Sequence, residues 1–168
     1  MSEHLTVLDI IDRSTKYLNK KGVPNSKCDV EWIISHVTKR GKLELYLDFG
    51  NFLGKEDLNK IRQCIVNRGK RIPLQHILKK VNFAGYELKC DKRALIPRPE
   101  TEYFTELIRE RITKEYKGKI LDFGTGSGAI IITLCLEIKN CKGFGMDKSI
   151  NALSLAKENI EFHNLENV

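Results

Sequence analysis

A glycine-rich segment, Asp122–Gly128, most constrains how this chain can fold. It reads Asp-Phe-Gly-Thr-Gly-Ser-Gly and lies between a short apolar stretch, 119–123, and a longer one, 129–138. The short stretch suits a strand and the longer one suits a helix, so the glycines mark the passage from strand to helix. A second strand over 142–146 and a second helix over 151–162 follow. This alternation predicts the start of a doubly wound α/β sheet.

Three kinds of site use glycine loops of this sort, and the neighbouring residues distinguish them. A phosphate-binding P-loop needs Gly-Lys-Ser/Thr, and this loop contains no lysine. A dinucleotide site usually has the spacing G-x-G-x-x-G, whereas Gly124, Gly126 and Gly128 give G-x-G-x-G with Asp122 two residues earlier. A carboxylate there favours a cationic ligand such as S-adenosylmethionine, which has a sulfonium and an ammonium group. A dinucleotide site, or a loop that only turns the chain, is the alternative.

A second acid agrees with this assignment. Asp147 follows the strand 142–146, and a strand-helix-strand unit places its carboxylate beside the glycine loop. There it can accept both ribose hydroxyls, in hydrogen bonds that contribute about 1.5–3 kcal/mol each. We expect no metal site. The predicted cofactor-binding residues are Asp122, Gly124, Thr125, Gly126, Ser127, Gly128 and Asp147.

The net charge of +7 is unevenly distributed. The first 80 residues carry 16 Lys and Arg against 9 Asp and Glu, whereas the remainder is balanced. A basic half suggests an acidic partner, either nucleic acid or a protein surface, although a solvated helix surface would look the same. The five cysteines lack metal or redox spacing, and no signal peptide or membrane-length apolar stretch is visible. A cytoplasmic protein with reduced thiols is expected.

Helical patterns dominate the first half. The apolar spacing predicts helices around Leu8–Leu18, from Ser26 to Gly41 and over Lys55–Arg68, with Leu8 and Trp32 in the core. Alternation from residue 81 to 90 predicts a β-hairpin, and a helix opening at Glu100 or Thr101 buries Phe104, Leu107 and Ile108. The expected domains are a helical bundle over 1–75, a hairpin linker over 76–100 and an incomplete α/β domain over 101–168.

These motifs together resemble those of a known family. The runs 95–102 (Leu-Ile-Pro-Arg-Pro-Glu-Thr-Glu) and 121–130 resemble the peptide chain release factor glutamine methyltransferases of the HemK/PrmC type. The runs 73–78 and 83–86 are similar to that family's linker hairpin, and 147–159 is similar to its second strand-helix unit. Ile72 and Lys79 depart from the acid and the glycine that the family often has there, which affects local linker geometry.

The resemblance implies a fold, a reaction and a partner. The fold is a small helical bundle, a β-hairpin linker and the start of a Rossmann-like class I methyltransferase domain. The reaction is methylation, by S-adenosylmethionine, of the glutamine side-chain amide in the Gly-Gly-Gln motif of class 1 release factors. The basic helical domain is expected to hold the release factor. Residues expected near the site are Arg98, Pro99, Glu100 and Thr101.

One family motif is absent from the sequence. The Asn-Pro-Pro-Tyr that grips the substrate amide is expected after Val168, so the catalytic residues are unknown. We therefore expect a truncated form that binds S-adenosylmethionine weakly and transfers no methyl group alone. A nucleic-acid or ribosomal-protein methyltransferase, or a non-catalytic partner-binding module, is the alternative. A nucleic-acid methyltransferase would bind nucleic acid directly, and we do not favour such binding for this chain.

Overall fold

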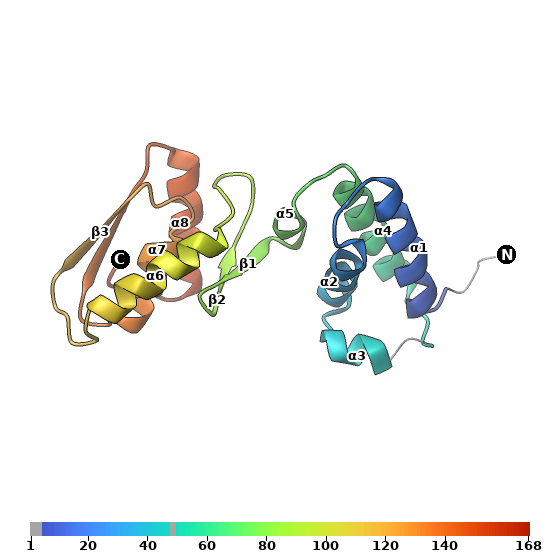
Figure 1. Cartoon of the computed structure of the whole chain (residues 1–168), viewed down its shortest axis with the longest axis horizontal. Helices are drawn as coiled ribbons and strands as arrows, with labels where there is room; N and C mark the ends of the chain where they lie inside the picture. The colour runs from blue at the N-terminus through green and yellow to red at the C-terminus, as the bar shows by residue number, and fades with distance from the viewer. Residues whose placement is uncertain (1–4, 48–49) are drawn as a thin grey trace. The chain divides into compact units, whose positions relative to one another are not determined.

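The computed structural model describes residues 5–47 and 50–168, which form two compact units that divide between Leu78 and Lys79 (Figure 1). The first unit is helical, and the second contains strands and helices. The division lies three residues after the predicted boundary at 75. The hairpin that the sequence analysis assigned to a linker is grouped with the second unit.

The first unit is a bundle whose helix ends follow local sequence signals. At its first helix, Thr6 Oγ1 accepts the Asp9 N–H and the Asp9 carboxylate accepts the Thr6 N–H, which is a capping box. The second helix ends at Thr38, three residues before the predicted end, because Lys39 takes a left-handed conformation. The helices are α1 (Val7–Lys20), α2 (Ser26–Thr38), α3 (Lys42–Leu47), α4 (Lys55–Gly69) and α5 (Leu74–Leu78).

The core of this unit joins α1, α2 and α4. The best buried side chains of these helices are Val7, Ile11, Leu18, Val30, Ile33, Ile34 and Ile61, and Leu45 of α3 joins them. An ion pair between α2 and α4 lies beside this apolar cluster. Arg68 Nε is 2.6 Å from Asp29 Oδ2, and the two side chains are 14% and 11% exposed. This pair therefore links the two helices by charge where little water can screen it.

Two apolar side chains predicted to lie in this core are exposed. Leu8 is 43% exposed, because the buried side of α1 runs through Val7 and Ile11. Trp32 is 45% exposed, because Ile33 and Ile34 take the inward positions on α2. The Nζ atom of Lys42 lies 4.3 Å from the centroid of the Trp32 ring. The prediction that Trp32 belongs to the core is therefore wrong, and its indole forms a cation–π contact at the surface.

The second unit contains two small sheets. Strands β1 and β2 pair antiparallel, and their turn uses Ala84 and Gly85 with positive φ angles of 49° and 88°. Strands β3 and β4 pair parallel, from Lys119 opposite Lys142 to Phe123 opposite Met146. The elements are β1 (Lys80–Phe83), β2 (Tyr86–Lys89), α6 (Pro99–Arg111), β3 (Lys119–Phe123), α7 (Ala129–Glu137), β4 (Lys142–Met146) and α8 (Ile150–Phe162).

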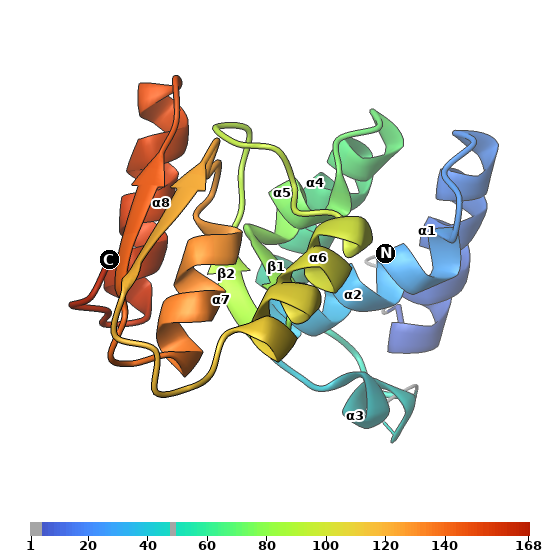
Figure 2. The ribbon, with the colours of Figure 1, turned by 60° about the vertical axis from the view of Figure 1, so that its left-hand side comes forward.

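Helix α7 forms the centre of the second unit. It contacts β3, β4, α6 and α8, and Figure 2 shows it between the hairpin and the parallel strands. The hairpin contributes Phe83 and Leu88, both fully buried, to the same core as Ile131 and Ile132 of α7. The hairpin is thus an integral part of the second unit, held by apolar packing.

Two features of the second unit concern exposed apolar groups. Phe104, which the sequence predicted to be buried, is 54% exposed, because α6 turns Thr105 inward instead. In the parallel sheet, four side chains at paired positions are exposed: Leu121 and Phe144, and Phe123 and Met146.

A helical bundle, a hairpin and the first strands and helices of a Rossmann-like domain are present, so the predicted fold class is confirmed.

Candidate functional site

The glycine loop between β3 and α7 depends on left-handed backbone at each of its glycines. Gly124, Gly126 and Gly128 have φ angles of 84°, 56° and 82°. Residues with a Cβ rarely adopt such values, which explains the residue type at all three positions. Gly128 has a further constraint, because an added Cβ would lie 2.7 Å from Ile132 Cδ1 and 3.3 Å from the Ala156 Cβ. Gly128 therefore lies close to both α7 and α8, and a side chain there would require Ile132 and Ala156 to move.

Backbone amides of the loop turn toward the end of β4. The N–H groups of Gly124 and Thr125 donate to the Met146 carbonyl, at 2.7 and 2.9 Å. The next amide, of Gly126, donates to Asp147 Oδ2 at 2.9 Å. Three successive amides thus fix the loop to Met146, which ends β4, and to Asp147, which follows it.

Asp147 is held in one orientation by the backbone around it. Its second oxygen, Oδ1, accepts the Ser149 N–H at 2.9 Å. The backbone N–H groups of Ser149 and then Gly126 hold the pKa of the Asp147 carboxyl below its usual range. Each carboxylate oxygen can accept a further hydrogen bond. Asp147 is therefore a fixed, ionised acceptor beside the glycine loop.

Asp122, which the sequence analysis predicted to favour a cationic ligand, also orients the glycine loop. Its Oδ2 accepts a hydrogen bond from Thr125 Oγ1 at 2.7 Å. Thr125 is buried, and an added Cβ on Gly145 would approach its side chain to 3.0 Å. Asp122 thus orients the first turn of the loop from the end of β3, and it also places a carboxyl group close to that loop.

A cavity of about 480 Å³ lies at the carboxyl ends of β3 and β4. Its lining consists of Phe123, Gly124, Met146, Asp147 and Lys148. Gly124 and Asp147 are predicted site residues, whereas Phe123, Met146 and Lys148 were not singled out. They directly adjoin predicted residues in the sequence, which is the signal that could have found them. The volume falls in the range typical of small-molecule sites, and its position is that of ligands in open α/β sheets.

Several other predicted site residues do not line this cavity. Ser127 and Gly128 are buried, and the Ser127 carbonyl accepts a hydrogen bond from Asn159 of α8. Arg98 precedes α6, whose first turn contains Pro99, Glu100 and Thr101, and none of the four lines this cavity. Their closeness to the site therefore stays a prediction.

Two further findings concern residues 5–47 and 50–168. Within those ranges, no three His, Cys, Asp or Glu side chains are grouped so that they could hold a metal ion. The helices within the same ranges are too short or too polar for any of them to cross a membrane.

Comparison with known proteins identifies both units. Residues 9–78 match the family model described as the PrmC N-terminal domain, and residues 114–168 match a methyltransferase domain. The chain is 41% identical over 96% of its length to a release factor glutamine methyltransferase of Fusobacterium nucleatum. Identity is 34% to the protein of that name from Deinococcus radiodurans and 33% to that from Geobacter sulfurreducens, each over 94% of this chain.

The matches cover almost all of this chain but only part of each relative. They span 46%, 57% and 55% of the three relatives, so the chain has about half their length. Both units match in the order in which they occur, the helical unit first and the methyltransferase unit second. The chain thus matches, over nearly all of its length, the release factor glutamine methyltransferases, and within it the PrmC N-terminal domain is followed by a methyltransferase domain segment.

Proposed function

We propose that this chain binds S-adenosylmethionine in the cavity at the carboxyl ends of β3 and β4, and that it is part of an enzyme that methylates glutamine. The observation that carries the proposal is the fixed carboxylate of Asp147 beside a glycine loop, in one cavity with Gly124. The methyltransferase match over this segment supports the same ligand class.

The residues present fit that ligand chemically. Asp147 would accept hydrogen bonds from the ribose hydroxyls, because its oxygens keep acceptor capacity beyond the two backbone N–H groups. Asp122, one strand away, adds negative charge that favours a cation. Phe123 and Met146 give the cavity an apolar lining suited to an adenine ring. When bound, S-adenosylmethionine supplies a methyl group on a positively charged sulfur.

Replacing Asp147 with alanine tests this site. We expect the affinity for S-adenosylmethionine, measured by isothermal titration calorimetry, to fall at least tenfold, since hydrogen bonds to a charged acceptor contribute about 1.5–3 kcal/mol each. Glu161→Ala, which removes an exposed carboxylate of α8, is the matched control and should leave the affinity unchanged. Equal affinities for wild type and Asp147→Ala would contradict the ribose role.

The acceptor that we propose is the glutamine side-chain amide in the Gly-Gly-Gln motif of class 1 release factors, in the cytoplasm. The names of the relatives support this substrate class. The basic first unit, with its PrmC N-terminal match, is proposed to hold the release factor, and the Arg98–Thr101 segment to lie toward the substrate. An amide nitrogen is a weak nucleophile, so its activation depends on acceptors that orient the NH2 group.

We propose that the 168-residue chain does not complete this reaction alone. The exposed pair Leu121–Phe144, which does not line the cofactor cavity, is a supporting observation, because a class I sheet normally buries such side chains. Incubation with a release factor and methyl-labelled S-adenosylmethionine should therefore give no label above a protein-free blank. A full-length relative serves as the positive control. Stoichiometric labelling of the release factor by this chain would refute the proposal.

A further inference from the structure

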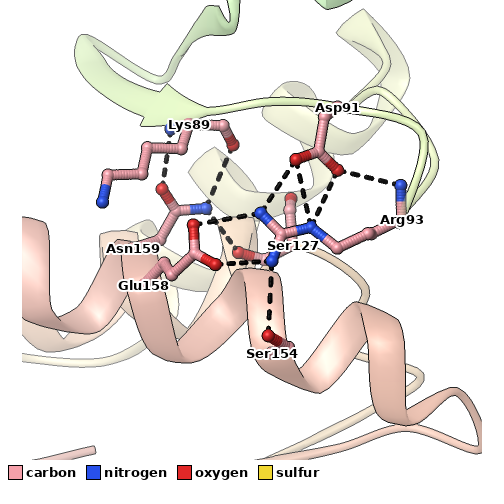
Figure 3. A network of polar contacts seen from close by, with 7 residues as sticks. All are labelled: Lys89, Asp91, Arg93, Ser127, Ser154, Glu158 and Asn159. Carbon is pink, nitrogen blue, oxygen red and sulfur yellow. Dashed lines mark hydrogen bonds and ion pairs between the residues drawn. The ribbon is translucent and has the colours of Figure 1, made fainter.

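A buried asparagine ties the glycine loop to the hairpin. Asn159 lies on α8 and is 0% exposed. Its Oδ1 accepts the Lys89 N–H at 2.7 Å, and its Nδ2 donates to the Lys89 carbonyl at 3.2 Å. The same Nδ2 donates to the carbonyl of Ser127 at 3.0 Å. One side chain thus joins the end of β2, helix α8 and the glycine loop, as Figure 3 shows.

The chemistry of these three bonds requires a primary amide. Two partners are carbonyl oxygens and one is an N–H group, so the side chain must donate twice and accept once at the same place. A carboxylate of the same shape could accept from Lys89 but could not donate to either carbonyl. An apolar side chain would leave all three backbone groups buried without this partner, which is costly.

A charged clamp next to Asn159 holds the chain that leaves the hairpin. Arg93 donates to both oxygens of Asp91 and to both oxygens of Glu158, which precedes Asn159 on α8. The hydrogen bonds from Arg93 lower the pKa of Asp91 to about 2. The Arg93 Nη1 also lies 3.3 Å from Ser154 Oγ (Figure 3). These hydrogen bonds fasten residues 91–93 to α8, and none of them involves the glycine loop, so Glu158 offers a control for Asn159.

We propose that Asn159 is a positioning residue for the cofactor site and couples the glycine loop to the β-hairpin. Asp147 holds the loop at Gly126, and Asn159 holds it one residue later, at Ser127. The peptide between Ser127 and Gly128, from which α7 begins, is therefore set by α8 and by β2. Asn159 is not among the residues that line the cavity, so it acts through the loop. The inference rests on the proposed cofactor function.

Coupling of this kind has a reciprocal consequence. If Asn159 joins the loop to β2, then the free energy by which its hydrogen bonds strengthen ligand binding equals the free energy by which the bound ligand strengthens those hydrogen bonds. A buried asparagine that served stability alone would give no such ligand dependence. Protection of the Lys89 amide on cofactor binding that exceeds the protection of other buried amides of the second unit thus distinguishes a positioning role from a structural one.

The test uses the whole chain with Asn159→Asp, and Glu158→Gln as the matched control on the neighbouring residue. We expect Asn159→Asp to weaken S-adenosylmethionine binding at least tenfold at about pH 8, the equivalent of one lost hydrogen bond of ~1.4 kcal/mol. Protonation of the introduced carboxyl at lower pH should restore one donor and part of the affinity. Glu158→Gln should change the affinity less than about twofold. Circular dichroism checks that each variant is folded.

Hydrogen exchange provides the second measurement and separates two kinds of failure. In the wild type, S-adenosylmethionine should slow exchange of the Lys89 amide, and in Asn159→Asp it should not. If the wild type gives no binding heat, the proposed cofactor function fails. The hydrogen bonds of Asn159 to the loop and to β2 are then tested by hydrogen exchange without ligand. The Lys89 and Gly128 amides should then exchange faster in Asn159→Asp than in wild type. Unchanged affinity, or unchanged exchange of both amides, in folded Asn159→Asp would overturn the inference.

Discussion

Replacing Gly128 with valine is expected to destabilise the second unit by about 3 kcal/mol or more and to abolish cofactor binding. Two costs combine in this variant. A β-branched residue is strained at the φ of 82°, and its Cβ would lie 2.7 Å from Ile132 Cδ1. Either Ile132 must rotate and Ala156 of α8 must shift, or the loop must change shape, and a change in the loop disrupts the cavity at the strand ends. Calorimetric unfolding and S-adenosylmethionine titration measure the two effects.

Gly124→Ala separates the backbone cost from the packing cost. Gly124 has a nearly identical φ of 84°, but no atom lies within 4 Å of an added Cβ. It should therefore lose only the smaller free energy of backbone strain, about 1 kcal/mol. If Gly128→Val proved no more destabilising than Gly124→Ala, the close packing of α7 and α8 would not be what fixes the loop.

The second large effect is expected at the ion pair in the helical unit. Asp29→Ala should lower the free energy of unfolding of the first unit by about 3 kcal/mol, because it leaves the Arg68 guanidinium little exposed and without this carboxylate. The double variant Asp29→Leu with Arg68→Met should recover much of that loss, since it removes both charges and adds apolar volume. The sequence contains one tryptophan, Trp32, so denaturant unfolding followed by its fluorescence reports on this unit.

Glu56→Ala is the control for that experiment. Its partner Lys60 is 2.6 Å away on the same helix, but the two side chains are 82% and 56% exposed. Water and salt screen such a pair, so its removal should scarcely shift the unfolding midpoint. A shift for Asp29→Ala as small as that for Glu56→Ala would show that solvent also screens the Asp29–Arg68 pair.

The sequence predicted the local elements of the second unit well. The strands at Lys119–Phe123 and Lys142–Met146 are found with the predicted bounds, and the predicted helices agree with α7 and α8 to within one residue. Apolar periodicity and the glycine punctuation are local signals, which is why they suffice. Burial along a helix was less predictable. Trp32 and Phe104 are exposed because neighbouring residues took the inward positions.

The candidate site was predictable where its residues belong to one strand-helix-strand unit. Asp147 follows a predicted strand, and parallel pairing with β3 necessarily brings it to the loop. Asn159 carried no comparable signal. It contacts Lys89 across 70 residues and Ser127 across 32, and a lone asparagine within a helix does not reveal such partners.

The sequence by itself determined the order of the elements, the glycine loop and the family, because these depend on residues close together along the chain. The tertiary structure alone decided how those elements are held. Packing on α7 made the hairpin part of the second unit, the Asp29–Arg68 pair joined α2 to α4, and Asn159 tied the loop to β2. These contacts join residues that are distant in the sequence and form only when the chain folds. Folding decides which polar groups are buried, and a buried polar group needs a hydrogen-bond partner.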